Sequence, residues 1–219
     1  MLNDSPSSET VLFSITAMLF SIVAISSAYM RLSKTTISND SKLEELNISR
    51  GVISIALLAE ESSSIRLGMP PITTISFFTG TRLDLQKEFL VRRLVDIVKL
   101  NPWLGGRLVK VNHRLHLNYN QPCSNMSEES AAAAIETGPS PLLRFAKLPG
   151  ISEDMKYEDL VSAVAPFAVS RTADVIGQDR ALFTVTAVET SAETFAIIFS
   201  ICHTIADGHT FYSLYGMLR

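Results

Sequence analysis

A histidine, an aspartate and a glycine stand close together near the carboxyl end of the chain, in the segment Cys202-His203-Thr204-Ile205-Ala206-Asp207-Gly208-His209. The unperturbed pKa of histidine, about 6.5, allows His203 to accept a proton near neutral pH, which suits a general base. Asp207 follows where a carboxylate can turn back into the protein and fix the loop. Gly208 tolerates backbone angles that other residues avoid. The segment therefore predicts a site of proton transfer.

Two neighbours of His203 are expected to be structural. Cys202 comes directly before the histidine, but a buried cysteine behaves as a small apolar residue, so we expect it to pack rather than to act as a nucleophile. His209 is expected at the start of a helix. A serine hydrolase is disfavoured because Ser200 does not lie in a Gly-x-Ser-x-Gly turn.

The elements around this segment predict a strand, a loop and a helix in that order. Residues 194–201 are almost entirely apolar, which predicts a buried strand. After the loop, apolar residues recur at helical spacing, which predicts a helix over residues 210–218; they are Phe211, Leu214, Tyr215 and Leu218. A buried strand thus delivers His203 to a loop that a helix closes.

A second segment, Asn101-Pro102-Trp103-Leu104-Gly105-Gly106-Arg107-Leu108, lies about a hundred residues upstream. The two glycines allow close approach of the backbone at a turn. Trp103 is expected to anchor the core. Arg107 is expected to reach a carboxylate inside the protein, either in a structural ion pair or near a substrate.

The two segments together resemble the HxxxDG and Pro-x-Leu-Gly-Gly-Arg-Leu signatures of acyltransferases with the chloramphenicol acetyltransferase-like fold, a superfamily that includes BAHD acyltransferases and condensation domains of peptide synthetases. The resemblance implies acyl transfer from a thioester, usually acyl-CoA as co-substrate, to a small alcohol or amine, with no other cofactor and no metal. It implies His203 as the general base, Asp207 as a structural residue paired with an arginine, and Gly208 as the bend of the loop. The sequence does not identify that arginine.

The resemblance covers only an amino-terminal half of the two-halved relatives. Their Asp-Phe-Gly-Trp-Gly segment is absent, and the sequence ends at Arg219. We therefore expect the site to be completed by a missing carboxyl half or by a second copy, as in an oligomer. The alternative is a catalytically inactive binding or scaffold domain, or a truncated fragment, derived from an acyltransferase.

Charge disfavours a nucleic-acid partner. The chain of 219 residues holds 19 Lys and Arg against 22 Asp and Glu, for a formal net charge of -3, and the basic residues are scattered. His113 and His116 are expected to decorate a hairpin rather than to bind a metal, because further donors are missing nearby.

The amino terminus predicts a membrane anchor. Residues 10–30 carry no charge and are long enough, as a helix, to cross a hydrocarbon core of about 30 Å. Asp4 and Glu9 precede the run, whereas Arg31 and Lys34 follow it, so the following domain is expected in the cytoplasm. A cleaved secretory signal peptide is the alternative.

The predicted organisation has three parts. Residues 1–34 form the tail and hydrophobic helix, residues 35–42 a polar linker, and residues 43–219 the acyltransferase-like domain. Within that domain we expect a mixed α/β sandwich: strands at 72–78, 182–189 and 194–201, a helix at 83–100, and a hairpin with arms at 108–111 and 115–119. Residues 121–150 are expected to form a long irregular connection with one short helix.

Overall fold

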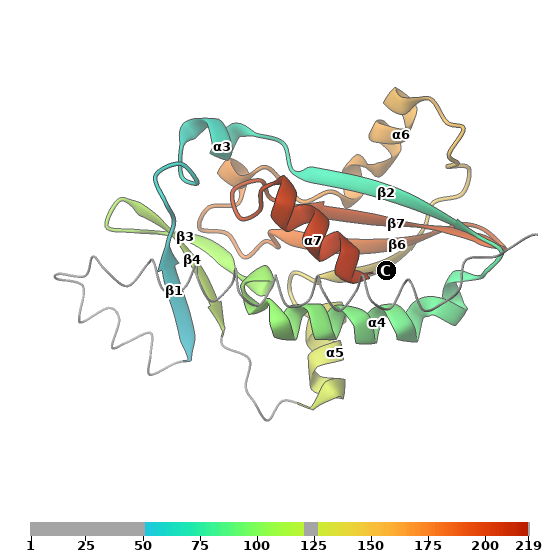
Figure 1. The fold of residues 1–219 in the computed structure, drawn as a ribbon, viewed down its shortest axis with the longest axis horizontal. Helices are drawn as coiled ribbons and strands as arrows, with labels where there is room; N and C mark the ends of the chain where they lie inside the picture. The colour runs from blue at the N-terminus through green and yellow to red at the C-terminus, as the bar shows by residue number, and fades with distance from the viewer. Residues whose placement is uncertain (1–50, 121–126, 219) are drawn as a thin grey trace, which may run out of the picture. The chain divides into compact units, whose positions relative to one another are not determined.

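Two β-sheets form in the computed structural model, which describes residues 51–120 and 127–218 (Figure 1). The larger sheet has four strands in the order β2-β7-β6-β5, namely Ile72–Thr79, Thr194–Ile201, Phe183–Ser191 and Leu143–Lys147. Its strands pair antiparallel except β5, which runs parallel to β6. The smaller sheet is antiparallel, in the order β1-β4-β3, namely Val52–Ala56, Arg114–Asn120 and Arg107–Val111. The expected mixed α/β fold is thus confirmed, while the expected amino-terminal hydrophobic helix lies outside the described residues.

Strand β7 lies inside the larger sheet and is covered on both faces, which explains its almost wholly apolar sequence. Side chains alternate between faces along a strand. Phe195, Ile197, Phe199 and Ile201 belong to the core beneath helices α4 (Leu83–Leu100), α5 (Glu128–Thr137) and α7 (Gly208–Leu218). Ala196 and Ile198 belong to the core on the other face, with side chains from α6 (Tyr157–Val164).

Helix α7 is fixed to the sheet by aromatic packing. It lies across β6 and β7, as Figure 1 shows. Phe211 on the helix meets Phe199 on β7 edge to face, with ring centroids 5.1 Å apart, and Phe199 meets Phe183 on β6 at 5.1 Å. Such aromatic pairs add about 0.5–1.5 kcal/mol beyond their burial. The strand before His203 and the helix after it therefore hold both ends of the loop.

The predicted helix and hairpin are confirmed. Helix α4 has the expected bounds and ends before Pro102, whose ring cannot continue it. Strands β3 and β4 meet at Asn112 and His113, which both have positive φ, 47° and 65°. Two residues with positive φ make the turn whose twist matches that of the flanking strands.

The connection expected to be irregular over residues 121–150 is more ordered than predicted. Helix α5 begins after Ser127, whose hydroxyl accepts from the Ser130 backbone amide. Strand β5 follows, and backbone hydrogen bonds to β6 hold it in the sheet. Its own sequence, which lies between Pro141 and Pro149, does not predict a strand. Short helices at Ser64–Gly68 (α3), Pro102–Gly105 (η1), Ala165–Phe167 (η2) and Thr172–Asp174 (η3) complete the elements.

The expected membrane localisation is corrected by the structure. Over residues 51–120 and 127–218 no helix is both long and apolar enough to cross a bilayer. The 18-residue helix α4 carries charged side chains, among them Asp84, Arg92 and Lys99, which a hydrocarbon core would exclude. The segment expected to be the anchor, residues 10–30, and the boundary expected near Leu43 both lie outside the described residues.

Candidate active site

In the loop after β7, side chains continue to alternate between buried and more exposed positions, as they do along a strand. Cys202, Thr204 and Ala206 are buried, with 1%, 2% and 3% of their surface exposed. His203 between them is only half-buried. The candidate base thus lies in a loop that alternates between buried and half-buried side chains, and Ile205 is half-buried as well.

Hydrogen bonds fix this loop to three neighbouring segments. The Cys202 backbone amide donates to the Leu182 carbonyl over 2.8 Å, at the start of β6. The Thr204 hydroxyl donates to the Thr172 hydroxyl over 2.8 Å, in η3. At the end of β7, the Ser200 hydroxyl accepts from the Val169 backbone amide over 3.1 Å. Satisfied polar groups of this kind in a buried setting hold one arrangement of the backbone.

Cys202 has the packing role expected from the sequence. Its thiol donates to the Ser170 carbonyl over 3.3 Å. Burial raises the pKa of Cys202 to about 11, against a smaller lowering by a hydrogen bond with Thr172. Because the thiolate is the nucleophilic form, this cysteine stays protonated near neutral pH and is a poor nucleophile.

Asp207 begins helix α7. Its carboxylate accepts from the Thr210 backbone amide over 2.8 Å, and its carbonyl accepts from the Phe211 amide over 2.9 Å, the pattern of an N-cap residue. Hydrogen bonds from the backbone and side chain of Thr210 lower the pKa of Asp207, and the charges of His209 and Arg66 lower it further. Gly208 is the first residue of the helix, and His209, exposed, is the second.

Arg66 is a neighbour of His203 that sequence reasoning missed. Its Nη1 lies 3.0 Å from Nδ1 of His203 and donates to the His203 carbonyl oxygen over 3.2 Å. Arg66 comes from α3, which packs against η3. The two residues are 137 positions apart, and no local pattern marks one arginine among many as the partner.

The upstream segment with two glycines builds a corner rather than a part of this loop. A Cβ on Gly106 would lie 2.8 Å from the Trp103 carbonyl oxygen and 2.7 Å from the Leu117 side chain, so only glycine fits. Arg107 pairs with Asp179 over 2.6 Å and donates to the carbonyls of Gly105 and Gly106. Trp103 packs against the cores of both sheets. Of the two roles expected for Arg107, the structure shows the ion pair.

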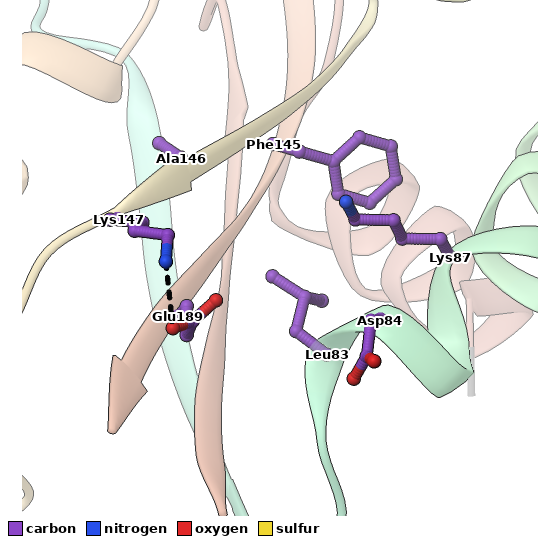
Figure 2. A pocket seen from close by; sticks show the side chains of 7 residues that line it. All are labelled: Leu83, Asp84, Lys87, Phe145, Ala146, Lys147 and Glu189. Atoms are coloured by element: carbon purple, nitrogen blue, oxygen red, sulfur yellow. Dashed lines mark ion pairs between the residues drawn. The ribbon is translucent and has the colours of Figure 1, made fainter. Parts of the chain in front are cut away.

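A cavity of about 270 Å³ opens at the opposite end of the larger sheet (Figure 2). Leu83, Asp84 and Lys87 line it from α4, and on the side of the sheet Glu189 from β6 pairs with Lys147 from β5 over 3.2 Å. The ammonium of Lys87 lies 5.3 Å from the centre of the Phe145 ring. Glu189 pairs with Phe195 at the start of β7, whereas His203 follows its end. At about 3.4 Å per residue, the strand from Phe195 to Ile201 alone spans roughly 20 Å, so the cavity lies far from the candidate base.

No cation site is formed in the part of the chain that the structure describes, where no three His, Cys, Asp or Glu side chains gather as a group able to hold a metal ion. His116 instead lies 3.2 Å through Nδ1 from the Ser54 hydroxyl, across strands β4 and β1.

Comparisons with known proteins identify the fold. No protein-family model and no curated protein sequence matches the chain. Among solved structures, the TRI3 trichothecene 15-O-acetyltransferase from Fusarium sporotrichioides matches with a TM-score of 0.52 at 15% identity, over 84% of this chain and 36% of that one. The first condensation domain of the calcium-dependent antibiotic synthetase matches with a TM-score of 0.51 at 18% identity, over 76% of this chain and 37% of that one.

These likenesses confirm the expected fold. The two sheets and their helices form part of the chloramphenicol acetyltransferase-like fold that acyltransferases and condensation domains share. The chain spans little more than a third of the length of these structures.

Proposed function

We propose that this chain carries the proton-transferring part of an acyltransferase site, with His203 as the general base. The observation that supports it most is the half-buried imidazole in a loop whose alternate residues Cys202, Thr204 and Ala206 are buried and which hydrogen bonds hold in place. The shared fold with an acetyltransferase adds support for acyl transfer as the reaction class.

The proposed reaction moves an acyl group from a thioester, usually acyl-CoA, to a hydroxyl or an amine. The acceptor oxygen or nitrogen attacks the thioester carbonyl carbon while His203 takes its proton, since an imidazole can accept a proton near neutral pH. The tetrahedral intermediate then collapses, the carbon–sulfur bond breaks, and the thiolate receives the proton from the imidazolium. No covalent bond to the protein forms, which agrees with the protonated, unreactive thiol of Cys202.

Asp207 and Gly208 have supporting roles in this proposal. By capping α7, Asp207 fixes where the loop ends; Gly208 is the first residue of the helix, where its φ is not positive and nothing lies within 4 Å of a Cβ. The facing wall of the substrate channel is proposed to come from a further chain segment or from a second copy, because the relatives are almost three times as long as the part that this chain matches.

The test compares His203→Gln with the intact chain and with His209→Gln as a matched control. We would incubate the full chain with acetyl-CoA and longer acyl-CoA esters, add panels of alcohols and amines, and follow free CoA and acylated product by mass spectrometry. Loss of general-base catalysis typically lowers the rate about 10²- to 10⁴-fold. His209→Gln should keep the original rate. Turnover by His203→Gln at the rate of the intact chain would refute the role of His203.

A second candidate is a binding or scaffold domain without catalysis. The position of the cavity favours it, because this hollow lies at the far end of the sheet from His203. Measuring the mass of the chain in solution together with turnover separates the two candidates. A monomer that binds acyl-CoA but releases no CoA would support the second candidate.

A further inference from the structure

The contact between Arg66 and His203 restricts the chemistry of the imidazole. A guanidinium has only N–H donors and stays protonated in proteins. Because Arg66 Nη1 lies 3.0 Å from Nδ1 of His203, that ring nitrogen must be the acceptor and carries no proton. The single proton of the neutral ring is then on Nε2.

This arrangement leaves the neutral ring without a free lone pair. Nε2 bears the hydrogen, and the lone pair of Nδ1 is directed to Arg66. A general base needs an unprotonated nitrogen facing the proton that it takes.

We propose that Arg66 is a positioning residue that sets the tautomer of His203 and blocks its basic nitrogen until the guanidinium is displaced. The tautomer stands on the geometry alone, whereas its effect on turnover rests on the proposed acyl-transfer function. Arg66 thus determines when His203 can accept a proton, acting through the imidazole and not on the acyl group or its acceptor.

Few hydrogen bonds hold the side chain of Arg66. It is half-buried on α3, a five-residue helix with no fully buried residue, whose Leu67 packs against the core of the smaller sheet. Two hydrogen bonds from one nitrogen, both to His203, join the guanidinium to the loop.

The first test is the reactivity of His203 toward diethyl pyrocarbonate, which attacks an imidazole lone pair. We would modify the full chain briefly and measure each histidine by peptide mass spectrometry. In Arg66→Met, which removes the donors but keeps a long side chain, we expect His203 to react roughly 10- to 150-fold faster, the factor corresponding to loss of hydrogen bonds to a charged group. Arg171→Met is the matched control, since exposed Arg171 pairs instead with Asp174.

The exposed residues His113 and His209 serve as internal standards and should react equally in all three proteins. A rate for His203 that is equal in the intact chain and in Arg66→Met would overturn the proposal. So would an increase of the same size in Arg171→Met.

The second test reads the tautomer directly, which a merely structural role of Arg66 would not change. Long-range nitrogen–proton spectra of the intact chain should show His203 with Nδ1 unprotonated and coupled to Arg66 across the hydrogen bond. In Arg66→Met the coupling should vanish and a population with the proton on Nδ1 should grow. A proton on Nδ1 in the intact chain would contradict the assignment. The signal of His203 is identified by its absence in His203→Gln.

Turnover separates this proposal from the function on which its consequence rests. In the acyl-transfer assay with acyl-CoA esters, Arg66→Met should turn over roughly 10- to 150-fold faster than the intact chain. If neither the intact chain nor Arg66→Met transfers an acyl group, while the reactivity and the tautomer of His203 change as expected, the proposed function fails and the assignment of Arg66 stands. If both turn over at one rate, the blocking role is wrong.

Discussion

The loop that holds His203 and the corner that holds Gly106 both follow the end of a regular element, but they use their polar groups differently. In the corner, the Arg107 guanidinium donates to two backbone carbonyls and pairs with Asp179. In the loop, the imidazole of His203 is half-exposed and meets one side chain, Arg66, that lies on a short surface helix. A group held by several fixed partners supports architecture, whereas a group with one displaceable partner can take part in chemistry.

The two regions also tolerate changes for different reasons. The corner is limited by space, because the backbone of Trp103 lies where a Cβ on Gly106 would be. The loop is limited by hydrogen bonds, which Asp207, Thr204 and Cys202 make to fixed neighbours. Substitutions in the corner should therefore act mainly on stability, and substitutions of His203 mainly on turnover.

Gly106→Ala should cause a larger loss of stability than any substitution in the loop. The added Cβ meets a backbone oxygen at 2.8 Å that cannot move without shifting η1. Overpacking of this kind costs about 1–3 kcal/mol in the free energy of unfolding. Urea denaturation followed by circular dichroism measures it.

Gly105→Ala is the matched control, because nothing lies within 4 Å of a Cβ at Gly105. It should be neutral or stabilising by up to about 1 kcal/mol, since alanine restricts the unfolded chain. Equal losses for the two variants would break the spatial account of the corner.

Asp207→Ala should give a smaller loss, about 1 kcal/mol at pH 7, because it removes the N-cap of α7. Asp207→Asn should lose only a fraction of this, since asparagine caps equally well. A loss as large in Asn as in Ala would show that the charge of Asp207, and not its capping geometry, stabilises the loop.

The pH dependence sharpens this prediction. The pKa of Asp207 in the folded protein lies below its ordinary value of 3.8. The corresponding stability is complete above the unfolded pKa and is lost as the pH falls through the folded pKa. Denaturation at pH 5 and pH 2.5 should therefore show a larger decrease for the intact chain than for Asp207→Asn, which does not ionise.

Arg107→Met should have the smallest effect. Asp179 is 62% exposed, so solvent screens this ion pair, and exposed pairs contribute at most about 1 kcal/mol. The difference in the free energy of unfolding should shrink further in 1 M salt. If acyl transfer fell strongly in Arg107→Met while stability held, the corner would belong to the site after all.

Much of the fold was predictable, because the elements involved are long and regular. The bounds of α4 follow from its helical apolar spacing and from Pro102, and β7 follows from its uninterrupted apolar run. Strand β5 was not predicted because its order comes from pairing with β6, which is a distant segment. Helix α3 has five residues, too few to show a period.

The candidate site divides in the same way. His203, Asp207 and Gly208 are neighbours in sequence, so their spacing alone marked them. Arg66 was missed because only the packing of α3 against η3 brings it to the ring of His203. The resemblance implied an arginine paired with Asp207 without saying which one; in the tertiary structure Arg66 donates to His203, and its charge also lowers the pKa of Asp207.

The sequence by itself determined that a buried strand delivers an imidazole to a glycine-containing loop closed by a helix, because hydrophobic periodicity and side-chain chemistry are local properties. Only the tertiary structure decided which nitrogen of that imidazole has a partner, because hydrogen bonds between segments 137 residues apart depend on how the sheets and helices pack.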